Sequence, residues 1–317
     1  MKIYTIGHLS PDLDAITSAV AYAEYLTVSK KYNEAIIVPL RPGSPNKEVE
    51  YIFNKFSLPI PKHIGEIKIL PEDKIILVDH NEPSQRHPII KPDQIIEILD
   101  HHKINVSFNN PIKIDIRPLG ATATIILDYF ELLGVSPTPQ LASAMVCAIL
   151  SDTLGLKAAT TTEIDVRTVE KLTKNFSLNT DELIFDVFKA KSDLSGMSFV
   201  EIVKKDYKMF EFSGKKVFIG GIETVEPEKV LESKQDLVTA LGEVKKELGA
   251  DLGFIFVSDI LKIYSIGIYQ NDDEKLVLNK AFSVEAKDFS VHVGSITSRK
   301  KDIAPAIEKA LILSMIG

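Results

Sequence analysis

Four short segments in the first half of the chain carry carboxylates and imidazoles, and each one follows an apolar run. These residues are His8, Asp12 and Asp14 in IGHLSPDLD, Asp79 and His80 in LVDHNE, Asp100, His101 and His102 in LDHH, and Asp152 in LSDT. Mixed imidazole and carboxylate ligands suit divalent metals of borderline hardness, such as Mn²⁺ or Co²⁺. Several carboxylates so close together could not stay ionised without cations between them. The four segments together predict a site for one or two metal ions.

Each segment taken alone also fits a structural role. Asp12 or Asp14 could cap the N-terminus of a helix. A histidine beside an aspartate is commonly a hydrogen-bonded surface residue, and Asp152 could be a turn residue. Four such coincidences on successive element ends favour the metal site.

A basic cluster near the C-terminus offers a different chemistry. Arg299 and Lys300 come just before a predicted final helix. Arginine binds phosphate oxygens as a fork and lysine binds them as a point charge. A solvated basic run is the alternative, but positive charge at a helix N-terminus opposes the helix dipole, which favours an anion there. Lys204, Lys205 and Lys208 form a second group, most of which the spacing predicts to be surface residues.

Composition bounds the class of protein. The chain has 317 residues, 45% of them hydrophobic, and a net charge of -7. That length is enough for two cores, and the charge argues against a nucleic-acid or anionic-membrane partner. The single cysteine, Cys147, lies in an apolar run and is expected to be a buried packing residue in a reducing compartment. The longest apolar run, 141–150, is too short to span a bilayer, so we expect a soluble cytoplasmic protein.

Other catalytic motifs are missing from the sequence. It contains no GxxxxGK[ST] loop, no GxGxxG fingerprint and no GxSxG elbow. His63, His87 and His292 have no carboxylate-rich neighbourhood in the sequence, and we expect them to be structural.

The elements of the first half alternate between short apolar runs and amphipathic stretches. The predicted strands are 2–7, 35–40, 74–78, 95–99 and 112–117, and the predicted helices are 15–29, 46–56, 121–133, 139–150, 162–174 and 181–189. This alternation predicts an α/β fold with a mostly parallel sheet covered by helices on both faces. Ligands bind at the carboxyl edge of such a sheet, where the four segments would meet.

A polar, small-residue stretch then predicts a domain boundary. We expect an N-terminal metal-binding domain at 1–189, a linker at 190–195 and a smaller mixed α/β domain at 196–317 that binds the substrate. The second domain is predicted to contain a hairpin turning at Ser213 and Gly214, a helix over 227–248, paired strands at 252–258 and 262–269, and a final helix over 303–316. The active site would lie in the cleft between the domains.

The motifs GHLSPDLD, DHNE, DHH and SDT resemble those of the DHH phosphoesterase superfamily, and with TSRKK the chain is similar to the family II, manganese-dependent inorganic pyrophosphatases. The resemblance covers essentially the full length, with the motifs in family order and spacing, and no insertion of CBS modules interrupts the first domain. It implies that His8 and Asp12 hold one metal, that Asp14, His101 and Asp152 hold the other, and that Asp79 bridges both.

The resemblance also implies the substrate residues and the reaction. His102 would face the substrate on the leaving-group side, and Arg299 and Lys300 match the family's phosphate-binding pair. The remaining catalytic lysine falls on Lys208, with Lys205 close enough to stay an alternative. The implied reaction is hydrolysis of pyrophosphate to two orthophosphates by a metal-activated hydroxide. It would use two Mn²⁺ (or Co²⁺) per subunit and Mg²⁺ arriving with the substrate, in a homodimer.

Three other functions remain open at this point. An exopolyphosphatase of the same superfamily is the closest rival, and a phosphodiesterase of oligonucleotides or cyclic dinucleotides is the next. The phosphodiesterases typically carry a GGGH motif near the C-terminus, which this chain lacks. A metal- or phosphate-binding protein without turnover is the alternative that is not an enzyme, and the presence of Arg299 and Lys300 argues against it.

Overall fold

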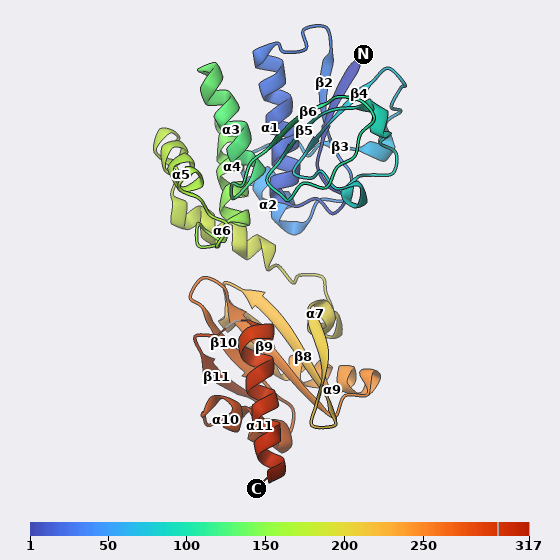
Figure 1. Cartoon of the computed structure of the whole chain (residues 1–317). Helices are drawn as coiled ribbons and strands as arrows, with labels where there is room; N and C mark the ends of the chain where they lie inside the picture. The colour runs from blue at the N-terminus through green and yellow to red at the C-terminus, as the bar shows by residue number, and fades with distance from the viewer. Residues whose placement is uncertain (297, 317) are drawn as a thin grey trace. The chain divides into compact units, whose positions relative to one another are not determined.

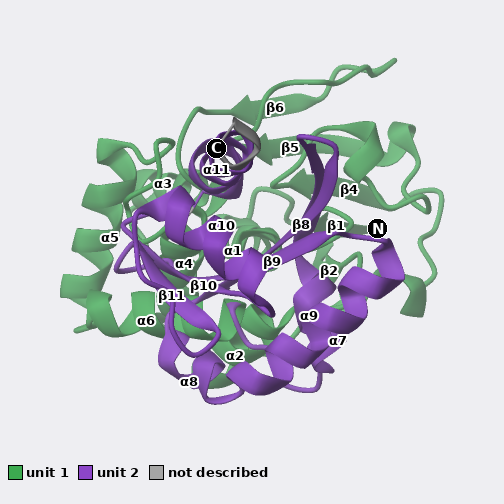
Figure 2. Cartoon of the chain, turned by 90° about the horizontal axis from the view of Figure 1, so that it is seen from below, with its two compact units in different colours: residues 1–191 green, residues 192–317 purple. Residues whose placement is uncertain are grey.

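A computed structural model describes residues 1–296 and 298–316 of the chain, so Thr297 of the TSRKK motif and Gly317 lie outside the described residues. The chain divides into two compact units. Unit 1 is Met1–Lys191 and unit 2 is Ser192–Gly317 (Figure 2). Each unit is built around its own sheet.

Unit 1 contains a sheet of six strands, and every pair of neighbours is parallel. The order across the sheet is β3 (Lys62–His63), β2 (Ile36–Arg41), β1 (Lys2–Ile6), β4 (Lys74–Val78), β5 (Ile95–Asp100) and β6 (Lys113–Ile116). The inner strands are almost wholly buried, as their continuous apolar sequences require when both faces are covered. The expected parallel sheet is confirmed.

Two helices of unit 1 lie on one face of this sheet, and a third packs on them. The helices α1 (Leu13–Ser29) and α3 (Thr122–Leu133) pack on the strands, and α4 (Pro139–Asp152) packs against these two helices (Figure 1). The other helices of the unit are α2 (Lys47–Lys55), α5 (Glu163–Asn175) and α6 (Thr180–Lys191). The opposite face packs against apolar side chains of connecting segments, such as Ile67 and Val106. The helical turns described in these segments are short 3₁₀ turns, whereas the sequence analysis had expected helices on both faces of the sheet.

Unit 2 contains a mixed sheet of five strands. The order is β11 (Ser290–Gly294), β10 (Tyr264–Ile268), β9 (Leu252–Asp259), β8 (Lys215–Thr224) and β7 (Tyr207–Phe212). The pair β8–β9 is parallel and the other neighbours are antiparallel. Apolar residues of α10 (Asp272–Phe282) and α11 (Ala304–Ile316) cover one face. The helices α7 (Phe199–Lys205) and α9 (Lys234–Leu248), which lie side by side (Figure 2), cover the other. The expected mixed α/β unit is confirmed.

Two predictions in unit 2 have opposite outcomes. The hairpin is confirmed, since β7 and β8 pair in antiparallel fashion around Ser213 and Gly214, which both have positive φ. The single helix over 227–248 is wrong, because the segment forms α8 (Pro227–Glu232) and α9 with a break at Ser233. The short polar side chain of serine favours such a junction over a helix interior.

Within the described part of the chain, no helix is both long enough and apolar enough to cross a membrane.

Candidate metal centre

The site begins where β1 ends and α1 starts. A Cβ at Gly7 would lie 2.7 Å from Ala15 Cβ, so only glycine allows the first turn of α1 to approach the strand this closely. Asp12 is the N-cap of α1 and accepts a hydrogen bond from Ala15 N at 3.0 Å. The same atom, Asp12 Oδ1, lies 3.6 Å from His8 Nε2. The capping role considered for Asp12 is therefore real, and it places this carboxylate beside the imidazole.

Asp14 is fully buried and connects α1 to the start of α3. Asp14 Oδ2 accepts a hydrogen bond from Thr122 N at 2.7 Å, and Asp14 Oδ1 accepts from Ala123 N at 3.0 Å and from Ser18 Oγ at 3.1 Å. These amide groups have no partner within α3, whose own N-cap residue offers no side-chain oxygen. Asp14 therefore caps α3 from another helix.

Asp79 follows β4 directly and has a left-handed backbone, with φ of 60°. Its amide nitrogen donates to Leu99 O of the neighbouring strand at 2.9 Å, which holds this unusual conformation in place. The two carboxylate oxygens point to different imidazoles. Asp79 Oδ2 lies 3.4 Å from His8 Nε2, and Asp79 Oδ1 lies 3.3 Å from His101 Nε2 and accepts from Thr122 Oγ1 at 3.0 Å.

The imidazole of His101 is oriented by the backbone. Its Nδ1 lies 3.1 Å from Leu119 O, a geometry in which Nδ1–H donates, so Nε2 is the nitrogen that could bind a metal. Nε2 is buried and has no hydrogen-bond partner among the described residues. Asp152 Oδ2, at the end of α4, lies 3.8 Å from this nitrogen. A buried imidazole nitrogen that faces carboxylates and has no hydrogen-bond partner fits a metal ligand, because a buried polar atom otherwise finds a partner.

The structure brings together all six predicted ligand residues. Three groups each offer ligand atoms within 4.8 Å of one another among the described residues: His8, Asp12 and Asp79; Asp14, Asp79, His101 and Asp152; and Asp79, His101 and His102. Asp79 belongs to every group. The set of imidazoles and carboxylates fits Mn²⁺ or a similar ion by its donor chemistry.

The protonation of this cluster shows how much negative charge it gathers. Burial lowers the pKa of His8 and of His101, but attraction to the nearby aspartates outweighs burial and raises each pKa to about 10. Burial, together with the other carboxylates, raises the pKa of Asp14 and of Asp152 well above the usual range. Burial also opposes ionisation of Asp79, but the two imidazoles beside its carboxylate hold its pKa below the usual value. Without a cation, the cluster favours bound protons.

His102 stands at the exposed rim of the cluster, with its side chain 49% exposed. Its Nδ1 lies 2.8 Å from Asp100 Oδ1, which also accepts hydrogen bonds from the amides of His101 and His102. Asn81 Nδ2 donates to Asp100 Oδ2 at 2.5 Å. Asp100 thus fixes the ring of His102, and His102 Nε2 is left as the nitrogen that can exchange a proton.

Two residues near the cluster fall outside the ligand groups. His80 is buried, with Nδ1 2.9 Å from Val78 O, and burial lowers its pKa to about 4, so the ring is neutral. Glu48, in the first turn of α2, is 1% exposed, and both of its carboxylate oxygens lack a hydrogen-bond partner among the described residues. Burial raises the pKa of Glu48.

Two contributions to the site were not predicted from the sequence. Thr122 binds Asp14 through its amide and Asp79 through its hydroxyl. Asn81 positions Asp100. Asn81 lies within the DHNE motif and could have been identified there, but nothing in the sequence around Thr122 indicates its contacts.

The predicted phosphate-binding residues lie in unit 2. Arg299 and Lys300 lie in a π-helical turn, Arg299–Ile303, that leads into α11. Arg299 is held by Asp206, with Nη2 2.7 Å from Asp206 Oδ1. Lys208 lies in β7 and is exposed, with Nζ 5.4 Å from the centre of the Phe210 ring. Lys205 is the last residue of α7.

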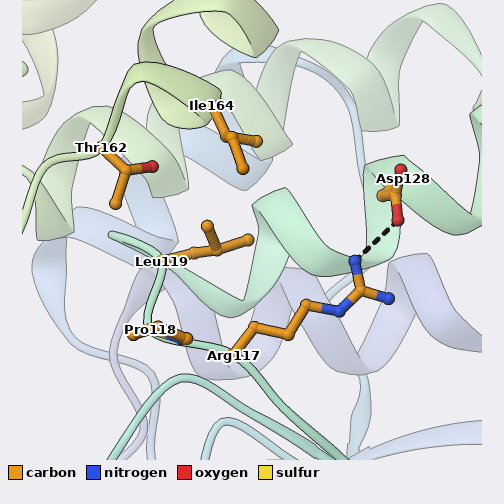
Figure 3. Close-up of a pocket in the computed structure, with 6 residues that line it drawn as sticks. All are labelled: Arg117, Pro118, Leu119, Asp128, Thr162 and Ile164. Atoms are coloured by element: carbon orange, nitrogen blue, oxygen red, sulfur yellow. Dashed lines mark hydrogen bonds and ion pairs between the residues drawn. The ribbon is translucent and has the colours of Figure 1, made fainter.

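A separate pocket in unit 1 does not include any of the predicted site residues. It encloses about 530 Å³ and is lined by Arg117, Pro118, Leu119, Asp128, Thr162 and Ile164 (Figure 3). Arg117 Nη1 donates to Asp128 Oδ2 at 2.6 Å, so its charge is already paired. This pocket is mostly apolar and does not compete with the metal centre as the reactive site.

Comparisons with known proteins identify the family. Residues 2–149 match the DHH family N-terminal domain, and residues 186–310 match the DHHA2 domain. The chain is 35% identical to the manganese-dependent inorganic pyrophosphatase of Methanocaldococcus jannaschii, covering 97% of this chain and 98% of that protein. The chain belongs to the manganese-dependent inorganic pyrophosphatases.

Further comparisons support this family assignment and show where the fold recurs. The enzyme of the same name from Methanothrix thermoacetophila is 33% identical over 98% of both chains. A crystal structure described as a Methanococcus jannaschii putative family II inorganic pyrophosphatase matches with a TM-score of 0.59 and 34% identity, over 97% of this chain and 99% of that one. An exopolyphosphatase-related protein from Bacteroides fragilis shares the fold, with a TM-score of 0.52 and 15% identity over 99% of this chain and 94% of that one.

Proposed function

We propose that this protein hydrolyses inorganic pyrophosphate to two orthophosphates in a reaction that depends on manganese. The observation that carries the proposal is the sharing of Asp79 between two groups of imidazole and carboxylate ligands, in a chain related over its full length to manganese-dependent pyrophosphatases. The exopolyphosphatase alternative is supported only by fold likeness at 15% identity.

The proposal assigns the ligands of two Mn²⁺ (or Co²⁺) ions in unit 1. His8 and Asp12 hold one ion, and the second is held by the residues Asp14, His101 and Asp152. Asp79 serves both, since its two oxygens face different imidazoles. Bound divalent ions would supply Lewis acidity and lower the pKa of water enough to give a nucleophile near neutral pH.

The protein residues around the ligands prepare the site for this chemistry. Leu119 O holds the ring of His101 in one tautomer, and the amides at the start of α3 hold Asp14. Such partners fix the orientation of a ligand before the metal binds. Thr122 Oγ1 occupies one lone pair of Asp79 and limits the rotation of the carboxylate.

His102 is proposed to act on the leaving-group side of the substrate. With Nδ1–H donating to Asp100, Nε2 is the nitrogen that gives or takes a proton. A histidine oriented by a buried carboxylate is a common acid or base in catalysis. His102 would therefore protonate the departing phosphate.

The cations of unit 2 are proposed to bind the phosphate oxygens. Arg299, Lys300 and Lys208 would neutralise charge on the equatorial oxygens and on the leaving phosphate, where fixed cations stabilise the transition state most strongly. Lys205 is the alternative to Lys208. Unit 1 would then be the metal-binding domain and unit 2 the substrate-binding domain.

Three further elements complete the proposal. A Mg²⁺ ion accompanies pyrophosphate into the site. The protein works in the cytoplasm, which suits a chain whose single cysteine is a buried thiol. It works as a homodimer, which light scattering coupled to gel filtration would test.

The test is phosphate release from pyrophosphate with Mn²⁺ and Mg²⁺, compared with a polyphosphate and with a dinucleotide. The expected result is rapid release from pyrophosphate and little from either control. Faster cleavage of polyphosphate would favour the exopolyphosphatase, and faster cleavage of the dinucleotide would favour the phosphodiesterase. Binding of Mn²⁺ without turnover of any of the three would contradict the proposal that the protein is an enzyme.

A further inference from the structure

Asp206 holds the guanidinium of Arg299 with two acceptor atoms. Arg299 Nη1 donates to the backbone oxygen of Asp206 at 3.0 Å, and Nη2 donates to Asp206 Oδ1 at 2.7 Å. Asp206 lies between α7 and β7, so the contact joins the end of one helix to the turn before α11. Two acceptors on two different nitrogens fix both the position and the plane of the guanidinium.

The acceptors in this arrangement are themselves held. The Asp206 backbone oxygen also accepts a hydrogen bond from Gly221 N of β8 at 2.8 Å. A Cβ at position 221 would lie 3.3 Å from Asp206 Oδ2 and 3.8 Å from Arg299 Nη1. The glycine therefore leaves room for both charged groups beside β8.

The backbone of Arg299 is fixed at both ends of its turn. Ser298 Oγ accepts a hydrogen bond from Lys301 N at 3.1 Å, and the Arg299 backbone oxygen accepts one from the amide of Ala304. The freedom that remains is that of the long side chain, and an arginine side chain carries about 2 kcal/mol of rotamer entropy. Asp206 removes much of that freedom before any ligand arrives.

The contact still leaves donors for a ligand. A guanidinium has five N–H donors, and Asp206 takes one from each Nη. Among the described residues, Nε–H and one N–H on each Nη have no other partner, which is enough for a bidentate contact to phosphate. We propose that Asp206 is a positioning residue, which presents the Arg299 guanidinium in a fixed orientation to a phosphoryl group of the substrate. The proposal rests on the phosphate-binding role proposed above for Arg299.

A purely structural ion pair would have different consequences. The Asp206 side chain is 59% exposed, and exposed pairs contribute little to stability. The Asp206 carboxylate also repels phosphate, so removing it would strengthen phosphate binding if charge alone mattered. If Asp206 acts by orienting Arg299, its removal weakens phosphate binding. If only its charge matters, the same removal strengthens phosphate binding.

The experiment is a double-mutant cycle on the full chain loaded with Mn²⁺. Asp206→Ala is expected to lower kcat/KM for pyrophosphate on the order of tenfold, because a displaced contact group loses part of its effect. Asp206→Asn keeps an oxygen acceptor at the same place and is expected to recover most of this loss. In an Arg299→Lys background, which has no planar fork, Asp206→Ala is expected to have no further effect.

Glu247→Ala is the matched control. Glu247 Oε1 accepts from Lys204 Nζ of α7 at 2.7 Å and its side chain is 54% exposed, much like that of Asp206. This control is expected to leave kcat/KM unchanged. The Mn²⁺ affinity should be the same in every variant, because the proposed ligands all lie in unit 1.

Two results would overturn the inference. One is an unchanged or raised kcat/KM in Asp206→Ala, and the other is additive losses from Asp206→Ala and Arg299→Lys. The affinity for methylenediphosphonate is measured by calorimetry on the wild type, Asp206→Ala, Arg299→Lys and the double variant. It gives the coupling between Asp206 and Arg299 in binding, without turnover. A wild-type protein that does not hydrolyse pyrophosphate would contradict the proposed function, while the binding cycle would still decide the role of Asp206.

Discussion

Loading the metal-free protein with Mn²⁺ should release protons, and the structure bounds their number. His8 and His101 each have a pKa raised to about 10, so both imidazoles carry a proton at pH 7.5. A metal ligand must be a neutral imidazole, so two protons must leave. Asp14 and Asp152 also have raised pKa values, so these two carboxyl groups can release as many as two more protons.

Charge balance gives the same upper limit. The four carboxylates in the ligand set bring a charge of about -4 when ionised, and two divalent ions bring about +4. Four protons therefore exchange for two ions without a change in the net charge of the cluster. Each proton released makes the binding constant rise tenfold per pH unit, or about 1.4 kcal/mol. The combined constant for two ions should rise by about 10² to 10⁴ per pH unit between pH 7 and 9.

The assay is calorimetry with Mn²⁺ at pH 7.5 in buffers of different ionisation enthalpy, such as Pipes and Tris. The slope of the observed enthalpy against the buffer enthalpy gives the number of protons. We expect two to four protons for each pair of ions. His8→Gln should lower the count by about one, because the amide carries no proton to release.

His87→Gln is the control for this measurement. His87 packs near His63 and belongs to none of the ligand groups found among the described residues, so its removal should leave the count unchanged. Release of fewer than one proton per pair of ions would refute the reasoning. An unchanged count in His8→Gln would remove His8 from the set of ligands.

Other substitutions test other parts of the chain. Asp79→Ala should abolish activity that depends on metal and lower the two-ion stoichiometry measured by calorimetry; near-normal activity with two ions bound would refute its shared role. Arg299→Ala should lower kcat/KM about 10²–10³-fold with Mn²⁺ affinity intact, and a loss of Mn²⁺ binding would contradict that role. Burial raises the pKa of the Cys147 thiol, so a thiol reagent should modify it only after unfolding; rapid labelling of the native protein would contradict this. Because burial raises the pKa of Glu48 in the folded protein, the stability of the fold falls as the pH rises above the pKa that Glu48 has in the unfolded chain. Glu48→Gln should therefore raise the Tm of the metal-free protein by about 2 °C or more at pH 8 and by less at pH 5. Equal Tm shifts at the two pH values would contradict this reasoning.

The convergence of the proposed ligands could be predicted because a parallel sheet has one carboxyl edge. His8, Asp79 and His101 follow β1, β4 and β5, which are neighbours in the sheet. Residues that follow neighbouring parallel strands must meet, whatever the details of the loops. The residues alone did not show that these strands are neighbours in the sheet. The resemblance, through the order of the motifs, implied that their residues share one site.

Thr122 could not be found in this way. Its amide meets Asp14 across a separation of 108 residues, and the contact depends on how α3 packs against α1. No local pattern encodes the packing of two helices at that separation. Contacts that a helix terminus makes with another helix become visible only in the folded chain.

The missed elements of unit 2 have a different explanation, because their signals were present. Ser198 and Glu201 form a capping box at the start of α7, and Asn271 and Glu274 form another at the start of α10. This pattern of a cap followed three residues later by an acid marks a helix start in sequence. The short strand β11 also carries a signal, because Val291 and Val293 are buried and alternate with the exposed His292.

The helix-cap interpretation and the metal-ligand interpretation of Asp12 turn out to be compatible. A capping hydrogen bond from Ala15 N fixes Asp12 Oδ1, and that fixed atom faces His8 Nε2. Asp14 is held in the same manner by the amides of another helix. A carboxylate that is already immobilised loses less entropy when a cation binds, so the caps reduce the free energy needed to assemble the site. An aspartate that caps a helix close to the end of a parallel strand is thus a better candidate ligand than a free one. The capping role of the carboxylate supports its role as a metal ligand.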